Sequence, residues 1–337
     1  MWTFSCFTFI SIIGVIAALP AESPILRKEP GLRYQYATDS QGENRLVDTW
    51  MTLKDVRDAA RYNPASHNAY HLFTRENPSV SQPLLINNAA VLEASNFDSE
   101  RRTVVLLHGW MNNAVSDFNT VVVAAYLAAE DVNVIVVDWS MGAASTNSNI
   151  LVLNTVSSGS AVANFIRWLN EASGSTLEQY HVVGHGTGGH QAGIVSRNLG
   201  NGVAYVTGLD PSLIGWTNNL FRFRPNDGIY TEVIHTNTGV NGFLADLAHV
   251  DFYPNGGISM PGCSSNACDH ARSFFYFAES LATEGFTGQE CHNFYLAVAG
   301  RCNTLPGRLG MGGLKPKNGR RGIFWLETNA APPFSRD

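Results

Sequence analysis

A glycine-rich turn, Gly184-His185-Gly186-Thr187-Gly188, is the stretch of this sequence with the clearest chemical meaning. It follows an apolar run and precedes a helix-compatible stretch, so it would place residue 186 at the apex of a strand-to-helix turn. A serine at such an apex attacks a carbonyl carbon through its hydroxyl oxygen. Gly186 has no side chain, so the pattern predicts a nucleophile position from which the nucleophile has been lost.

Two further side chains could complete the same chemistry. Asp210 ends the apolar run 204–210, and His270 is expected on a loop that leads into an apolar helix at 274–281. Taken alone, a strand-end aspartate is more often a cap or turn residue, and a single histidine more often has a structural role. The order of apex, aspartate and histidine along the chain, however, is the order that hydrolytic triads of this type use. We therefore expect Asp210 to orient His270 as a general base.

Backbone groups would complete the site. The turn His108-Gly109-Trp110 follows the apolar run 103–107. Turns of this kind supply one N–H group to an oxyanion hole, and the residue after the nucleophile supplies another. One N–H group of this turn and that of Thr187 are therefore the predicted oxyanion hole.

These groups need a scaffold that brings several strand ends together. Continuous apolar, β-branched runs are typical of buried parallel strands, and they occupy residues 103–107, 133–137, 181–183, 204–210 and 232–235. Helix-compatible spacing fills the intervals 114–130, 158–170 and 188–199. The alternation predicts the α/β class: an α/β-hydrolase fold with a mostly parallel central sheet and helices on both faces. Ligands bind such sheets at the carboxyl ends of the strands.

The beginning of the chain differs from the rest. Residues 1–21 are rich in apolar side chains and end in small residues, which predicts a cleaved secretory signal peptide; an uncleaved membrane anchor is the alternative. Residues 22–65 are polar and contain three prolines, so we interpret them as a loosely ordered leader or propeptide. The globular domain is expected to span residues 66–337. After the signal, no stretch of the sequence is apolar enough to suggest a transmembrane segment.

Composition excludes one class of partner. The 337 residues carry a formal net charge of −6, and lysine and arginine are scattered along the chain. Without a basic cluster, binding to a phosphate backbone has no electrostatic basis, so nucleic acid is not an expected partner. We expect no cofactor.

Four cysteines follow the signal: Cys263, Cys268, Cys291 and Cys302. An even number in an exported chain indicates two disulfides, for which three connectivities are possible. We favour the local pairs 263–268 and 291–302. A zinc site is the alternative, but these spacings are not C-x-x-C pairs.

Residues 66–310 resemble the neutral, pancreatic-type lipases, a family that includes insect lipases, phospholipases A1 and the non-catalytic yolk proteins of flies. The resemblance rests on the segments 72–78, 104–110, 136–139, 183–190, 208–211, 233–236, 249–257, 261–263 and 268–273. It implies that Asp210 and His270 are the acid and base of a triad, and that Trp110 and Thr187 form the oxyanion hole. The serine of the family is Gly186 here, so this chain resembles a member that lacks the nucleophile.

Other departures from the family pattern concern metal, lid and partners. Asn219 and Arg224 stand where pancreatic-type lipases have carboxylates for calcium, and only Asp227 remains, so no metal is predicted. Four residues lie between Cys263 and Cys268, where the family has its lid, so the acyl groove should be open to solvent. We expect neither the second, lipid-binding sandwich domain of pancreatic lipases nor a colipase-like partner.

The sequence therefore predicts a secreted, extracellular lipase-family protein that binds a lipid or fatty-acyl ligand without cleaving it, or serves as a yolk-like store. The alternative is an active carboxyl-ester hydrolase, a triacylglycerol lipase or phospholipase A1 in lipid catabolism. Activity would require Thr187 as nucleophile, or water activated by His270 with Asp210 behind it. A store would need no ligand at all.

Overall fold

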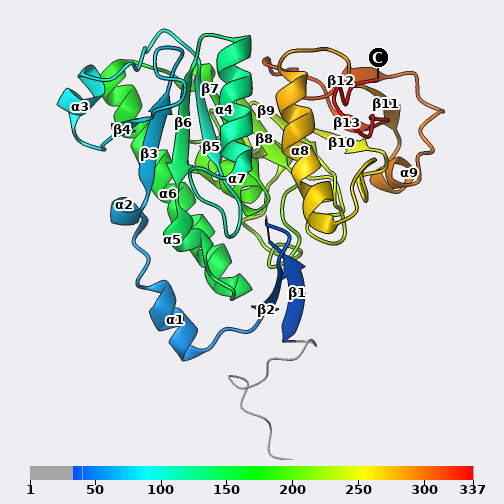
Figure 1. Ribbon diagram of the computed structural model, residues 1–337, viewed down its shortest axis with the longest axis horizontal. Helices are drawn as coiled ribbons and strands as arrows, with labels where there is room; N and C mark the ends of the chain where they lie inside the picture. The colour runs from blue at the N-terminus through cyan, green and yellow to red at the C-terminus, as the bar shows by residue number, and fades with distance from the viewer. Residues whose placement is uncertain (1–32, 40, 337) are drawn as a thin grey trace, which may run out of the picture.

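A sheet of eleven strands forms the centre of the computed structural model, which describes residues 33–39 and 41–336 (Figure 1). Together with a separate two-stranded hairpin, the strands of the described residues are β1 (Tyr34–Thr38), β2 (Asn44–Asp48), β3 (Ala69–Phe73), β4 (Gln82–Leu84), β5 (Thr103–Leu107), β6 (Asn133–Asp138), β7 (Tyr180–His185), β8 (Tyr205–Leu209), β9 (Tyr230–Ile234), β10 (Val250–Pro254), β11 (Thr287–Cys291), β12 (Arg308–Gly310) and β13 (Gly322–Leu326). The large sheet has the order β12-β11-β13-β10-β9-β8-β7-β5-β6-β3-β4, and β1 and β2 form a separate antiparallel hairpin.

Helices lie on both faces of this sheet. They are α1 (Leu53–Ala59), α2 (Pro64–His67), α3 (Ala89–Glu93), α4 (Asp117–Ala129), α5 (Ser140–Ala143), α6 (Ser148–Ser173), α7 (Thr187–Asn198), α8 (Asn266–Ser280) and α9 (Phe294–Val298), with short 3₁₀ turns η1 (Leu177–Gln179) and η2 (Pro225–Asp227). Strands β6, β5, β7, β8, β9, β10 and β13 pair in parallel, and antiparallel strands extend the sheet at both edges. This is the mostly parallel α/β-hydrolase arrangement that the sequence predicts.

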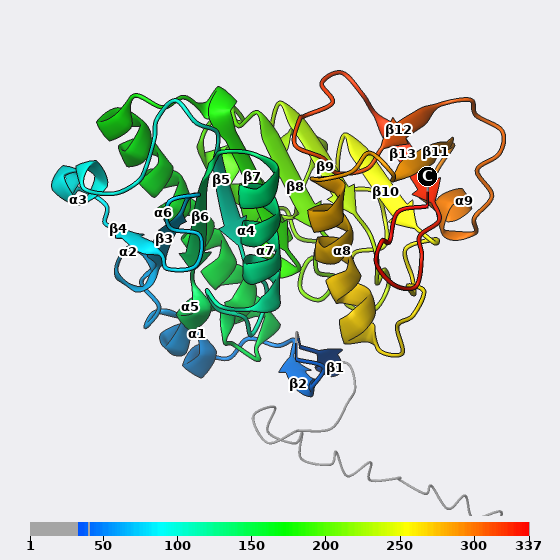
Figure 2. The same ribbon diagram turned by 45° about the horizontal axis from the view of Figure 1, so that its top comes forward.

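Strand β5 shows why the apolar runs are continuous. Val105 and Leu107 belong to one buried cluster, with side chains of α6 and α7, whereas Val104 and Leu106 belong to another, with side chains of α4 and α8. Because successive strand residues point to opposite faces, a strand covered on both sides needs an apolar residue at every position. Figures 1 and 2 show α4 and α8 side by side on one face, with α6 and α7 on the other.

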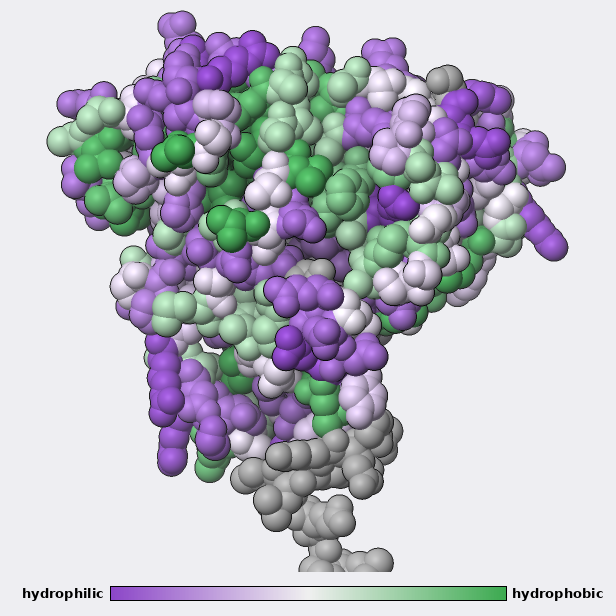
Figure 3. Space-filling view, in the orientation of Figure 1, coloured by the Kyte–Doolittle hydropathy of each residue, from purple (hydrophilic) through white to green (hydrophobic). Residues whose placement is uncertain are grey.

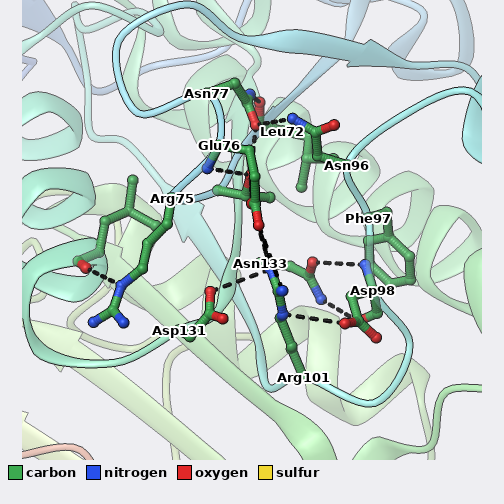
Figure 4. A network of polar contacts seen from close by, with 12 residues as sticks. Leu72, Arg75, Glu76, Asn77, Asn96, Phe97, Asp98, Arg101, Asp131 and Asn133 are labelled. Carbon is green, nitrogen blue, oxygen red and sulfur yellow. Dashed lines mark hydrogen bonds and ion pairs between the residues drawn. The ribbon is translucent and has the colours of Figure 1, made fainter.

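The segment around Glu76, one of those that carry the family resemblance, joins the edge strand β3 to the neighbouring loops (Figure 4). The Asn77 amide donates to the carbonyl oxygen of Leu72 at 2.9 Å and accepts from Asn96 at 3.0 Å. Arg101 forms ion pairs with Glu76 and with two aspartates, Asp98 and Asp131, at 3.1–3.4 Å. This network fixes the edge of the sheet far from the glycine-rich turn, so we assign it a structural role.

Most predicted elements are present, with two corrections. Helix α6 begins ten residues before the predicted start, where Asn147 caps it by accepting from the N–H groups of Asn149 and Ile150. Helix α8 begins at Asn266, capped by Ser265, so His270 lies within the helix and not on a loop before it. Both predicted disulfides, Cys263–Cys268 and Cys291–Cys302, are confirmed. Residues 1–21, the predicted signal peptide, lie outside the described part of the chain.

The polar segment before residue 66 differs from the loose leader that we expected. Its described part contains the β1–β2 hairpin and helix α1, which has a capping box between Thr52 and Asp55. Arg33, which is buried, joins the two ends of the hairpin through a two-pronged contact with Asp48 at 2.6 and 2.8 Å. Polarity misled the prediction because this hairpin is held by ion pairs and hydrogen bonds more than by an apolar core. Whether the segment is removed as a propeptide stays a prediction.

Candidate active site

The turn between β7 and α7 has the conformation of a nucleophile elbow. Gly186 adopts φ 57° and ψ −121°, a region that side chains other than hydrogen enter at a cost in strain. Its flanking glycines allow strand and helix to cross closely: a Cβ at Gly184 would lie 1.8 Å from the carbonyl oxygen of Gly188, and a Cβ at Gly188 would lie 2.0 Å from that of Leu107. The glycine-rich sequence is thus required by packing as well as by the turn.

Asp210 and His270 form a hydrogen-bonded pair. Nδ1–H of His270 donates to Oδ2 of Asp210 at 2.6 Å. The backbone N–H groups of Thr236 and Asn237 donate to Oδ1 at 2.9 and 3.1 Å, so both oxygens of this fully buried carboxylate are held. The arrangement fixes the imidazole with Nδ1 protonated, which leaves Nε2 facing away from the aspartate.

His270 faces Gly186 from the other side of the turn. A Cβ at position 186 would lie 3.0 Å from Nε2 of His270 and 3.5 Å from Oγ of Ser212. The imidazole therefore points at the space that a serine side chain would occupy. The structure brings together the apex, the acid and the base, although their catalytic roles remain predictions.

The predicted oxyanion hole has free donors. Thr187 is the first residue of α7, and Trp110 lies in the turn after β5. Within the described residues, neither of these two backbone N–H groups donates to a protein acceptor. Both residues line the same pocket as Gly186 and His270, and their role as an oxyanion hole stays a prediction.

Ser212 is a site residue that the sequence reasoning missed. Its hydroxyl lies 3.1 Å from the hydroxyl of Thr187, which is buried, and its backbone N–H donates to the carbonyl oxygen of Gly186 at 3.2 Å. Its position two residues after Asp210, at the same strand end, was the available signal. The Thr187 hydroxyl makes its contact with Ser212 and not with His270, which weighs against Thr187 as a nucleophile.

His185 packs against His270. The rings of His185 and His270 have centroids 4.2 Å apart, and Nε2–H of His185 donates to the backbone carbonyl of His270 at 3.3 Å. Burial, and in second place repulsion by His270 whenever that ring is protonated, lowers the pKa of His185 well below its usual value. His185 is thus a neutral support that holds the start of α8 against the elbow.

The β1–β2 hairpin forms a roof over this pocket. Ala37, Thr38, Asp39 and Val47 line the pocket together with the elbow and His270. Figures 1 and 2 both show the hairpin near the end of α8 at which that helix begins, and a Cβ at Gly42 would lie 3.9 Å from Cβ of Ala267. No residue between Cys263 and Cys268 lines this pocket, whereas four residues of the hairpin do. The pocket is therefore bounded by the hairpin, which the expectation of an open groove did not include.

The base of the hairpin is anchored to the start of α6. Asp48 N–H donates to the carbonyl oxygen of Thr146, and the amides of Asn147 and Asn149 donate to the carbonyl oxygens of Trp50 and Thr49 at 2.5 and 2.7 Å. The tip, residues 41–45, is exposed, and the outer surface of the hairpin is mostly hydrophilic (Figure 3). The hairpin is therefore fixed at one end and polar on its outer side.

The region matched to the calcium site holds an ion pair. Asp227 receives Nε and Nη2 of Arg197 at 2.9 and 2.7 Å, and the backbone N–H of Arg224 at 2.9 Å. No group of three or more histidine, cysteine, aspartate or glutamate side chains able to hold a metal ion occurs among residues 33–39 and 41–336. One described helix, α6, is long and apolar enough to cross a membrane, but it is 61% buried within the fold over its most apolar stretch.

A parallel sheet covered on both faces, an elbow between β7 and α7, and an Asp–His pair at the strand ends together define an α/β-hydrolase. Comparison with known proteins narrows the class. The family model described as Lipase matches residues 34–334. Pancreatic lipase-related protein 2 of Bos taurus is 34% identical over 263 residues, which are 70% of this chain and 56% of that protein. The chain belongs to the lipase family.

Two pancreatic triacylglycerol lipases are also similar. That of Homo sapiens is 31% identical over 268 residues, 70% of this chain and 56% of that protein, and that of Sus scrofa is 31% identical over 305 residues, 79% of this chain and 66% of that protein. The chain thus spans about half to two thirds of the length of these relatives. The family match starts at residue 34, so it includes the hairpin that we took for part of a leader.

Proposed function

We propose that this protein binds an acyl lipid in the pocket beside Gly186 and does not hydrolyse it. The observation that carries the proposal is that the apex of the elbow is glycine while Asp210 and His270 remain paired and aimed at it. Loss of the serine from a hydrolase triad lowers turnover on the order of a million-fold. The remaining oxyanion hole and pocket can still bind the group that a lipase would cleave.

Exposure to lipid outside the cell is part of the proposal. The two disulfides and the pancreatic relatives are consistent with an extracellular protein, as the apolar residues 1–21 suggest. We infer a secreted carrier or decoy whose ligand reaches the pocket past the hairpin. A colipase-like partner, nucleic acid and cofactors have no part in the proposal.

The second candidate function is an active carboxyl-ester hydrolase in lipid catabolism. The intact Asp210–His270 pair favours it, because His270 could activate a water molecule next to Gly186. The named relatives are lipases, which also gives this candidate weight. We prefer binding because a water molecule activated by His270 is a poor substitute for a serine nucleophile held at the apex of the elbow.

Three measurements on the secreted full chain test the proposal. We expect native mass spectrometry to reveal bound acyl lipid, no turnover of p-nitrophenyl butyrate, a phospholipid or a triacylglycerol, and no covalent adduct with a fluorophosphonate probe. The matched control for any residual turnover is His270→Ala. Turnover that this variant abolishes would establish the hydrolase, whereas no lipid and no turnover would favour a yolk-like store.

A further inference from the structure

The space left by the missing side chain at residue 186 has a definite chemistry. It lies against Nε2 of His270 and Oγ of Ser212, within 3.5 Å of both when measured from the position of a Cβ. Trp110 and Thr187, whose backbone N–H groups have no protein acceptor among the described residues, line the same pocket. The pocket thus brings together two residues with free backbone donors, an imidazole and a hydroxyl.

We propose that this pocket binds the carboxyl group of a free fatty acid, with one oxygen in the oxyanion hole and the other in the space beside Gly186, between His270 and Ser212. This inference rests on the proposed function and names its ligand class. A carboxyl group has two oxygens in one plane, separated by one carbon, and it can satisfy both sets of partners at once.

The proton balance of this contact is simple. Nδ1–H of His270 is committed to Asp210, so Nε2 of the neutral ring is an acceptor. At neutral pH a fatty acid is a carboxylate, so one proton is taken up from water on binding and lies in the hydrogen bond between one carboxyl oxygen and Nε2. No bond to carbon forms or breaks, and no further reactant is required. Charge-assisted hydrogen bonds of this kind are stronger than neutral ones.

Other ligand classes fit less well. An ester presents a carbonyl oxygen to the oxyanion hole but carries a carbon substituent on its second oxygen, which has no proton for His270. A long-chain alcohol reaches His270 but has no oxygen for the hole. A serine at position 186 would itself fill the space, so the binding mode is specific to the glycine.

The acidic residue of the roof does not oppose an anionic ligand. Asp39 lines the pocket, but its Oδ1 accepts the N–H groups of Gln41 and Glu43, and its Oδ2 pairs with Arg45 at 2.9 Å. The pocket lining also includes the apolar residues Val47, Leu151 and Ile214, which can contact an acyl chain.

Calorimetric titration with decanoic acid, methyl decanoate and decanol, each below its aggregation concentration, tests the inference on the full secreted chain after removal of bound lipid. We expect the acid to bind at least about tenfold more tightly than either of the other two ligands. Equal affinity for acid and ester would overturn the carboxyl inference and leave the proposed function standing. Binding of none of the three would overturn both.

Variants locate the carboxyl group. Gly186→Ala places a Cβ in the space and should weaken decanoic acid about tenfold, with little effect on methyl decanoate. The control is Gly200→Ala: Gly200 also has positive φ, 73°, but a Cβ there meets nothing within 4 Å. If Gly186→Ala fails to fold, Ser212→Ala removes one partner without altering the turn and should weaken the acid alone. Unchanged affinity for the acid in the folded variants would contradict the assignment.

Discussion

At the scale of single residues, the apex of the elbow lacks the hydroxymethyl group that a serine would carry there. Asp210 holds His270, His270 faces residue 186, and the two N–H groups of Trp110 and Thr187 are free. The sequence predicted these five positions, and their catalytic roles stay predictions. Four of them lie at the ends of strands that can be recognised in one dimension, whereas His270 was expected on a loop and lies within α8. It did not identify Ser212, since the proximity of this hydroxyl to the elbow depends on how the loop after β8 folds back.

Gly186→Ser should restore ester cleavage. The backbone already has the elbow conformation, and a Cβ at 3.0 Å from Nε2 of His270 would bring a serine hydroxyl within reach of the base after a small shift of the ring. We expect hydrolysis of p-nitrophenyl butyrate to rise about a hundredfold or more above the native protein. Strain at positive φ should cost about 1 kcal/mol of the free energy of unfolding. The double variant with His270→Ala should lose the gain; a Gly186→Ser protein that folds and stays inert would show that other parts of the machinery are misplaced.

At the scale of elements, the close crossing of β7, α7 and β5 fixes the elbow. A Cβ at Gly188 would lie 2.0 Å from the carbonyl oxygen of Leu107 and 2.6 Å from that of His108, and both are backbone atoms that cannot move aside alone. We therefore expect Gly188→Ala to reduce the free energy of unfolding by about 3 kcal/mol or more, measured in urea. Gly310→Ala is the control, since a Cβ there meets nothing within 4 Å, and it should change stability by less than about 0.5 kcal/mol. Similar losses in both variants would contradict this account of the crossing.

The hairpin is the element that the sequence could not predict. Its strands are short, and its role as a roof depends on polar contacts with α6, which lies a hundred residues later in the chain. The parallel strands, by contrast, were predictable because a strand buried on both faces needs an apolar residue at nearly every position. Elements held by a core are visible in a sequence, whereas elements held by particular ion pairs are not.

Loosening the hairpin should speed ligand release. Arg33→Met removes the two contacts with Asp48 at the hairpin base. Breaking a buried ion pair leaves the partner charge unsatisfied, and a loss of only about 1.4 kcal/mol corresponds to tenfold in an equilibrium constant. We expect the dissociation rate of a bound fluorescent fatty acid to rise at least about tenfold in stopped-flow measurements. Lys54→Met, which removes an exposed ion pair with Asp58 on α1, should leave the rate unchanged. An equal rate in Arg33→Met and the native protein would show that the hairpin does not control exit.

At the scale of the whole molecule, buried histidines couple stability to pH. Burial lowers the pKa of His181, His185 and His190, in the last case to about 3. His190 shows why: its Nε2–H donates to the carbonyl oxygen of Ser212 at 2.8 Å, and its Nδ1 accepts the N–H of Phe223 at 3.0 Å, so a second proton would oppose a donor. The folded protein keeps these rings neutral, while the unfolded chain protonates them near pH 6.5.

These buried histidines should make the folded protein less stable as the pH falls. Below about pH 6.5 the unfolded state binds more protons than the folded state, so the free energy of unfolding should fall as pH falls, by about 1.4 kcal/mol per pH unit for each histidine. Burial raises the pKa of Asp227 and Asp269, which opposes this trend only near the range where carboxylates titrate. Urea unfolding at pH 7.5, 6.0 and 5.0 measures the slope. His190→Gln, which keeps a donor and an acceptor, should reduce the slope by the share of one histidine, whereas His292→Gln, at an exposed position, should not. A slope that is flat between pH 6 and 5, or unaffected by His190→Gln, would mean that the buried rings accept protons without loss of the fold. These three histidines would then not limit the stability of the protein in acid.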